Sequence, residues 1–165
     1  MGMIRFNEVL ALVVGTTPQI ITETICALVQ QKPPVYPEKI YVITSAVGKK
    51  TAEERLIDNG LFQAFAKEFK LDKLTLTRND FVVMRDSVCR EIEDITGAEE
   101  SEALGDVITS LIRDLTSDPS VRLHCSIAGG RKTMSFYMGA ALQLFGRPWD
   151  KLYHVLVTPD FESNP

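Results

Sequence analysis

The chain has 165 residues and a formal net charge of −4, and 45% of its residues are hydrophobic, 24% charged and 8% aromatic. This ordinary globular composition predicts one domain, residues 1–165, with enough chain to bury a proper core. The acidic balance argues against binding long DNA or RNA, which needs a basic face, but it allows a small anion in a locally positive pocket.

The chain begins with a strand and a helix. Residues 9–14 form a short apolar run that stops at Gly15, which predicts a strand buried on both faces. The following stretch, TTPQIITETICALVQQ, predicts a helix with Thr17 as its N-cap and Pro18 at its first position. Pro33 and Pro34 end this helix.

The later segments continue the alternation of strands and helices. In chain order we expect a strand at 39–45, a helix at 51–69, a strand at 75–84, a short helix within 85–98, a helix at 100–118, a strand at 120–128, a helix at 131–146 and a strand at 150–159. Thr51 and Glu54 have the spacing of a capping box, which predicts the start of the first of these helices.

This alternation predicts an α/β fold of the Rossmann-like, doubly wound kind: a mostly parallel sheet with helices on both faces. Ligands of such sheets bind beyond the carboxyl ends of the strands, where loops meet helix N-termini. Three loops, 15–18, 45–50 and 127–133, should therefore gather at one edge.

The loop CSIAGGRKTMS, residues 125–135, has the strongest signal of a binding site. Two glycines let the backbone approach a ligand and expose its N–H groups, and the next helix adds its positive end. Arg131 and Lys132 supply charge, and Thr133 supplies a hydroxyl. The alternative is an ordinary helix start with two solvated cations. Because cations oppose the dipole of a helix N-terminus, we expect an anion, most plausibly phosphate, to compensate for them.

The two earlier loops contribute smaller polar groups. Thr17 is at least as well explained as a helix cap, whereas Thr16 and Gln19 are freer to meet a ligand. Lys49 and Lys50 are typical of a solvated surface. The candidate ligand-binding residues of the three loops are Gly15, Thr16, Thr17, Gln19, Ser45, Ala128, Gly129, Gly130, Arg131, Lys132 and Thr133.

Several common kinds of site are absent from the sequence. The spacing fits neither a Walker A loop nor a Gly-x-Gly-x-x-Gly dinucleotide site, and no Gly-x-Ser-x-Gly elbow occurs. No metal-ligand spacing occurs, so we expect neither a metal nor a cofactor, and His124 should be packed or hydrogen-bonded within a strand. The cysteines Cys26, Cys89 and Cys125 are expected to be free thiols. With no signal peptide and no apolar stretch that could span a membrane, we expect a cytoplasmic protein.

Three longer motifs carry a resemblance to a known family. VVGTTPQIITETICAL, SIAGGRKTMSFYMGAAL and LYHVLVTPDFES together resemble the CARF domains of CRISPR-associated proteins, and the nearest branch is that of the ring nucleases. CARF domains are Rossmann-like sensors of the cyclic oligoadenylates that type III CRISPR complexes make. The resemblance covers almost the whole chain and is most specific in the first and third motifs and in residues 129–133.

The resemblance implies a ligand, a partner and a reaction. The ligand is a cyclic tetra- or hexa-adenylate, bound across the two-fold axis of a homodimer. Ring nucleases need no metal: a ribose 2′-OH attacks the neighbouring phosphate and leaves a 2′,3′-cyclic phosphate. The roles that map onto this sequence are electrostatic stabilisation by Lys132 and positioning by Thr16 or Thr17. No residue stands out as a general base.

Two other functions remain open at this point. A pure sensor would bind the ring without cutting it and switch a fused effector, for which the end of the chain at Pro165 leaves room. Outside the family, a monomeric α/β protein could use the same helix starts to bind a mononucleotide.

Overall fold

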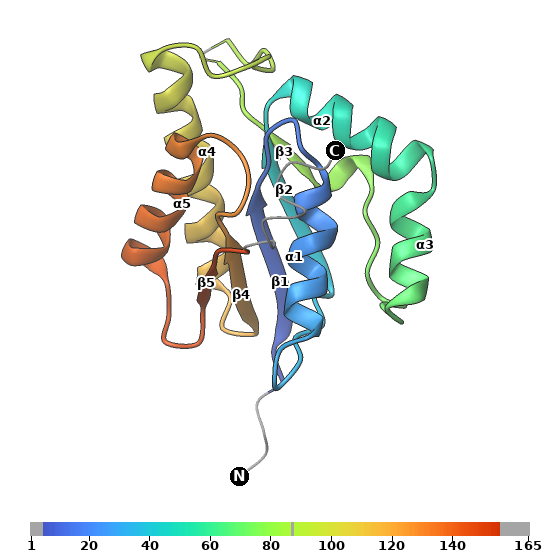
Figure 1. Cartoon of the computed structure of the whole chain (residues 1–165). Coiled ribbons are helices and arrows are strands. Elements are labelled where there is room, and N and C mark those ends of the chain that lie inside the picture. Colours follow the sequence, from blue (N-terminus) through green and yellow to red (C-terminus); the bar gives the residue numbers. More distant parts are fainter. Residues whose placement is uncertain (1–4, 87, 156–165) are drawn as a thin grey trace.

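The protein folds around one parallel sheet. The computed structural model describes residues 5–86 and 88–155. Five strands pair in parallel in the order β3-β2-β1-β4-β5 (Figure 1). The strands are β1 (Asn7–Val13), β2 (Lys39–Thr44), β3 (Phe81–Val83), β4 (Val121–Ser126) and β5 (Lys151–Tyr153). With helices on both faces, this arrangement confirms the Rossmann-like α/β class.

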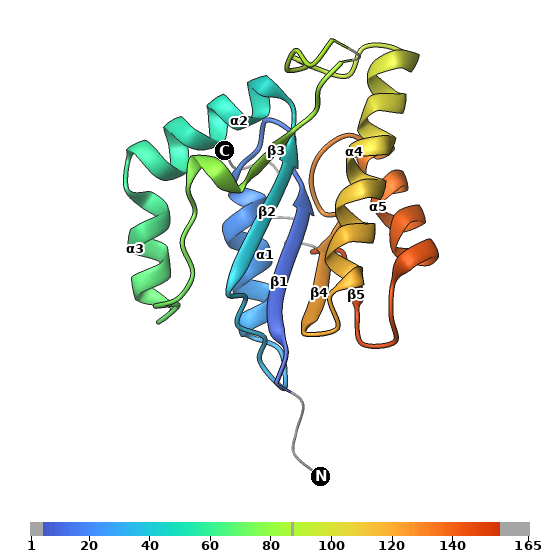
Figure 2. The same cartoon turned by 180° about the vertical axis from the view of Figure 1, so that it is seen from behind.

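Helices cover both faces of the sheet (Figures 1 and 2). The helical elements are α1 (Gln19–Val29), α2 (Ala46–Ala52), the π-helical turn η1 (Glu53–Asp58), α3 (Leu61–Glu68), the 3₁₀ turn η2 (Arg78–Asp80), α4 (Ala98–Ser117) and α5 (Lys132–Phe145). The elements α1, η1 and α3 pack on one face, and α4 and α5 on the other. Among the described residues, none of these helices combines the length and the apolar character needed to cross a membrane.

Strand β1 lies at the centre of the sheet and faces two separate cores. Leu10 and Leu12 pack into the core under α1, whereas Ala11 and Val13 pack into the core under α4 and α5. The unbroken apolar run of this strand follows from burial on both sides, as the sequence predicts.

The chain changes face between two neighbouring strands. Strand β1 leads into α1 on one face, and its neighbour β4 leads into α5 on the other. The connections therefore diverge and leave a crevice at the carboxyl ends of β1 and β4. This is the topological switch point, where open α/β sheets bind their ligands.

The second helical segment starts earlier than the sequence predicts. The expected loop at 46–50 is helical, because Ser45 caps α2 by accepting a hydrogen bond from the N–H of Gly48 at 3.2 Å. The predicted capping box is wrong: Thr51 lies inside the helix and donates its hydroxyl to the carbonyl of Val47. The segment is also not one helix, since it breaks at Gly60, whose φ is +67°.

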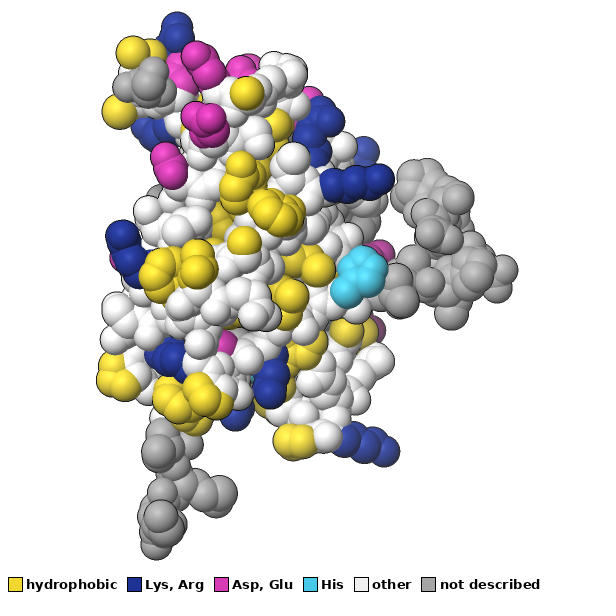
Figure 3. All heavy atoms as spheres, turned by 90° about the vertical axis from the view of Figure 1, so that its left-hand side faces the viewer, with side chains coloured by type: hydrophobic (Ala, Val, Ile, Leu, Met, Phe, Trp, Pro, Cys, Tyr) yellow, Lys and Arg dark blue, Asp and Glu magenta, His cyan; other side chains and the backbone are white. Residues whose placement is uncertain are grey.

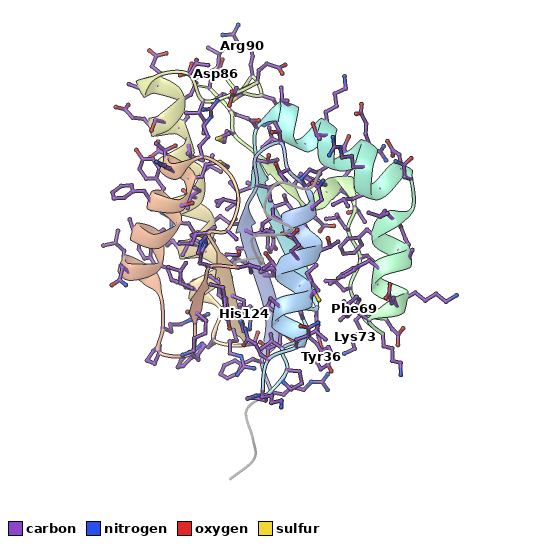
Figure 4. All side chains as sticks on the ribbon, in the orientation of Figure 1. Tyr36, Phe69, Lys73, Asp86, Arg90 and His124 are labelled. Carbon is purple, nitrogen blue, oxygen red and sulfur yellow. The ribbon has the colours of Figure 1, made fainter. Side chains whose placement is uncertain are left out.

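The segment around β3 differs most from expectation. The predicted strand at 75–84 shrinks to three residues, because Asp80 accepts the N–H and hydroxyl of Thr77, both at 2.8 Å, and this closes the turn η2. The short helix predicted within 85–98 is wrong. There Asp86 accepts the N–H groups of Val88 and Arg90, at 3.0 and 2.8 Å, and such side-chain bonds compete with a helix (Figure 4).

The other elements match the predictions. The helices expected at 100–118 and 131–146 are α4 and α5, and the strand at 120–128 is β4. Strand β5 ends at Tyr153, and the part of the predicted last strand beyond residue 155 lies outside the described residues.

His124 is a structural residue of the sheet, as expected. Its side chain is 2% exposed, with Nε2 2.7 Å from Oε2 of Glu8 and Nδ1 3.1 Å from the hydroxyl of Tyr153. Arg122 also binds Glu8, which fits an ionised carboxylate accepting from Nε2–H while Tyr153 donates to Nδ1. Burial lowers the pKa of His124 and outweighs the opposing effect of Glu8. Figure 4 shows His124 below the carboxyl ends of the strands.

This buried histidine predicts that the protein loses stability in mild acid. Histidine in the unfolded chain binds a proton below about pH 6.5, whereas folded His124 resists protonation because its pKa is lowered. The unfolded state then binds more protons, so the free energy of unfolding should fall by up to about 1.4 kcal/mol per pH unit below that value. Urea unfolding between pH 7.5 and 5.5 measures this slope.

Two variants assign the slope to one residue. His124→Asn should be less stable at pH 7.5 but show a flatter dependence on pH. His154→Gln, which changes an exposed histidine, should keep the wild-type slope. An unchanged slope in His124→Asn would contradict the assignment.

Candidate functional site

A cavity of about 560 Å³ lies at the switch point. It is lined by Gly15, Thr16, Thr17, Ile20, Glu23, Ser45, Val47, Asp94, Ala128, Gly129, Gly130 and Arg131. Its volume falls within the roughly 300–1,000 Å³ typical of small-molecule sites. The three loops predicted to gather at one edge of the sheet therefore do meet around one cavity.

Most of the predicted ligand-binding residues line this cavity, but three do not. Gln19, Lys132 and Thr133 are absent from its walls. Lys132 and Thr133 are exposed on the first turn of α5. Oε1 of Gln19 is buried without a hydrogen-bond partner among the residues that the structure describes.

Glycines allow the loops to converge. A Cβ atom at Gly129 would lie 2.8 Å from the carbonyl oxygen of Val13 and 2.9 Å from Cγ2 of Ile20. Gly130 has a φ of +76°, which favours glycine. A Cβ atom at Gly15 would lie 3.4 Å from the Cα atom of Gly130. The sequence predicts that Gly129 and Gly130 allow close approach of a ligand; in the structure, Gly129 also allows close approach to β1 and α1.

The start of α1 leaves its threonines available to a ligand. The predicted N-cap is wrong, because Pro18 occupies the cap position and α1 has no side-chain cap. Thr16 and Thr17 are exposed and line the cavity. Within residues 5–86 and 88–155, neither hydroxyl makes a hydrogen bond. Both can therefore donate to a bound oxygen atom.

Arg131 is compensated by a protein carboxylate. Its guanidinium binds both carboxylate oxygens of Asp94, with Nε 3.0 Å from Oδ1, so the compensation expected for this cation is present within the protein and does not require a bound anion. Hydrogen bonding to Arg131, followed by the N–H of Ile95, lowers the pKa of Asp94. No local pattern in the sequence indicates this pair, because Asp94 lies in the irregular segment before α4.

The N-termini of two helices contribute positive electrostatic potential to the cavity. The N-termini of α1, with 11 residues, and α5, with 14 residues, both meet its walls. Their first N–H groups have no partner within the helix, and the dipole adds partial positive charge there. The side chains add one arginine and two carboxylates, Asp94 and Glu23. A ligand that fits must therefore offer both negative charge and hydrogen-bond donors.

Three residues of the cavity wall besides Asp94 were not predicted from the sequence: Ile20, Glu23 and Val47. Ile20 and Glu23 both face the cavity from α1. Residues three apart share one face of a helix. Once the start of α1 is placed beside the site, the spacing of Ile20 and Glu23 therefore predicts that both face the same side. Val47 lies in α2, in a segment for which the sequence predicts a loop.

A larger cavity of about 920 Å³ lies between the 85–96 segment and α4. Eight of its lining residues are acidic and two are arginines, so it is unsuited to an anion. Among the described residues, no group of three His, Cys, Asp or Glu side chains is placed to hold a metal. The three cysteines are free, as expected, and burial raises the pKa of Cys125 far above that of an exposed thiol.

One comparison with known proteins bears on this site. Residues 17–165 match the family model described as CRISPR-associated protein NE0113 (Cas_NE0113). The match spans nearly the whole chain, including α1 and the loop between β4 and α5. No curated protein matches the chain.

Proposed function

The chain belongs to the CRISPR-associated NE0113 family, and from this premise we propose that it binds a cyclic oligoadenylate of type III CRISPR defence, most directly cyclic tetra-adenylate. The observation that carries the proposal is the cavity at the switch point, between the N-termini of α1 and α5. Helix N-termini bind phosphate through free N–H groups and the helix dipole. Thr16 and Thr17 add hydroxyl donors for the same phosphates.

We further propose that the protein cleaves the ring slowly without a metal. The ribose O2′ attacks the adjacent phosphorus, the P–O5′ bond breaks, and the proton lost from O2′ is balanced by protonation of O5′. The products are a 2′,3′-cyclic phosphate and a free 5′-hydroxyl. Thr16 and Thr17 would hold the phosphate in line for attack, and Lys132 would stabilise the developing charge.

A homodimer is part of this proposal, because a ring with two-fold symmetry suits two identical sites. Support comes from apolar side chains on the face formed by α5 and β5. Phe136 and Leu144 of α5 are 69% and 73% exposed, and Leu152 of β5 is 45% exposed. Figure 3 views this face and shows several hydrophobic patches across it. Helix α5 also begins at the cavity, so a partner bound along it would lie near the ligand.

A sensor that does not cleave is the second candidate. The position of Lys132 favours it, because this side chain is exposed and does not line the cavity. Lys132 acts in cleavage only if the ring extends beyond the cavity of one protomer. The two candidates share the binding site and differ in the fate of the ring.

One experiment separates these functions. Purified protein is incubated at stoichiometric concentration, in EDTA, with cyclic tetra-adenylate or cyclic hexa-adenylate, and bound and linear products are separated by chromatography. Linear product ending in a cyclic phosphate supports the ring nuclease, and an intact bound ring supports the sensor. Light scattering of the complex tests the dimer. Failure to bind either ring would contradict the proposal.

The role of Lys132 yields a specific prediction. Lys132→Ala should slow cleavage about 10²-fold, the usual effect of losing one group that stabilises transition-state charge. The matched control is Lys67→Ala, which removes an exposed lysine from α3, away from the cavity, and should cleave at the wild-type rate. Equal rates for wild type and Lys132→Ala would remove Lys132 from the mechanism.

A further inference from the structure

We infer that Glu23 is the specificity-determining residue of the cavity and that it selects a base carrying an amino group, such as the N6 amino group of adenine. This inference rests on the proposed function and adds to it how the base is recognised. Nothing in the three sequence motifs marked this residue as a ligand contact.

The position of Glu23 along α1 shows in which direction the cavity extends from the start of the helix. Helix α1 begins at Gln19, so Glu23 lies about 6 Å further along its axis at 1.5 Å per residue. Ile20 lies between the helix start and Glu23 on the same face, and both line the cavity. The cavity therefore extends from the N-terminus of α1 along the side of the helix.

The chemistry of the wall changes along this direction. At the helix start, N–H groups, Thr16 and Thr17 offer donors suited to phosphate. The side chain of Ile20 is apolar, and it is held in place against Gly129. Glu23 then presents a carboxylate. A nucleotide with its phosphate at the helix start would lay its base along Ile20 and bring the edge of the base to Glu23.

Of the two carboxylates that line this cavity, that of Glu23 lacks a protein partner among the described residues. Asp94 is occupied by Arg131 and by the N–H of Ile95. In the part of the chain that the structure describes, Glu23 makes no hydrogen bond or ion pair, although it is half-buried. An ionised carboxylate only accepts hydrogen bonds, so its partner in a complex must be a donor.

The hydrogen-bond donors of the ligand limit which of its groups can bind Glu23. The phosphodiester oxygens of a cyclic oligonucleotide only accept, so they cannot satisfy Glu23. Adenine offers its N6 amino group, whereas hypoxanthine presents an acceptor oxygen at the same place and keeps a donor only at N1. A carboxylate placed to accept from the N6 amino group discriminates against hypoxanthine, because it then faces an acceptor oxygen in place of that donor.

The test compares cyclic tetra-adenylate with its inosine analogue, in which each N6 amino group is replaced by oxygen. Equilibrium dissociation constants are measured for wild type, Glu23→Gln and Glu23→Ala. Wild type should prefer the adenylate by about 10-fold or more, Glu23→Ala should bind both about equally, and Glu23→Gln should regain affinity for the inosine ring, because its amide donates. Glu68→Gln, the same change on an exposed residue of α3, should keep the wild-type preference.

The outcomes separate this inference from the proposed function. If wild type binds the adenylate ring and both Glu23 variants keep its preference over the inosine ring, Glu23 does not read the base, and the proposed function stands. The same holds if the variants lose cleavage alone, since Glu23 would then contact the ribose hydroxyl. If wild type binds neither ring, the proposed function is overturned, and this inference with it.

Discussion

Gly129→Ala should destabilise the protein by about 1–3 kcal/mol, the usual penalty for overpacking a close contact. The new Cβ atom would lie 2.8 Å from the carbonyl oxygen of Val13, a backbone atom at the end of the central strand. It would also meet Ile20 at 2.9 Å, so relief requires that the β4–α5 loop move away from α1. Because this movement opens the cavity wall, ligand affinity should fall as well. Urea unfolding and ring binding measure the two effects.

Gly139→Ala is the matched control. Gly139 lies inside α5, and a Cβ there would meet nothing within 4 Å. Alanine favours a helix interior by roughly 0.8–1.0 kcal/mol over glycine, so this variant should gain stability and bind like wild type. If Gly129→Ala were as stable as wild type, the close junction of the two loops would not be required for folding.

Under the proposed function, Arg131→Glu should weaken the binding of cyclic tetra-adenylate by about 10- to 100-fold, since a positive charge at the cavity wall is replaced by a negative one that repels the phosphates. The remaining binding should depend less on salt, because one attraction that ions screen is lost. The variant also places a carboxylate beside Asp94 in place of the observed ion pair. Titrations at low and high salt measure both effects.

A charge swap separates the structural role of Arg131 from its role toward the ligand. Arg131→Glu combined with Asp94→Arg restores an opposite-charge pair at the rim of the cavity with the positions exchanged. If Arg131 contacts phosphate itself, the swap should recover the stability of the loop but not the full affinity. Full recovery of affinity would show that the pair only holds the loop in place, and wild-type affinity in Arg131→Glu would exclude a contact.

The two adjacent glycines of the β4–α5 loop could be recognised as part of the site from the sequence, but their packing could not. Gly129 and Gly130 marked the β4–α5 loop as special, and the loop does line the cavity. The structure adds a role that the sequence does not indicate, because the close packing of β1 and α1 leaves no room for a side chain at Gly129. A sequence shows that a side chain is missing, but not which atoms occupy the space.

Local competition explains the errors in the elements. Thr51 and Glu54 fit a capping box, yet Ser45, six residues earlier, caps the helix that forms. Asp86 and Asp80 bind nearby N–H groups and replace a predicted helix and most of a predicted strand by turns. Each of these local hydrogen-bonding patterns is compatible with the sequence, and packing against the sheet determines which of them forms.

The α/β class, the central buried strand and the edge at which the loops meet can be predicted from the sequence, because apolar periodicity and helix starts are local properties of the chain. Which side chains face the cavity follows from the three-dimensional packing alone. The fold pairs Arg131 with Asp94, brings Glu23 to the wall and leaves Lys132 outside it. These contacts depend on how closely segments that are distant in the sequence approach one another in space; 37 residues separate Arg131 from Asp94. Such distances are set by the packing of whole helices on the sheet, which no local pattern encodes.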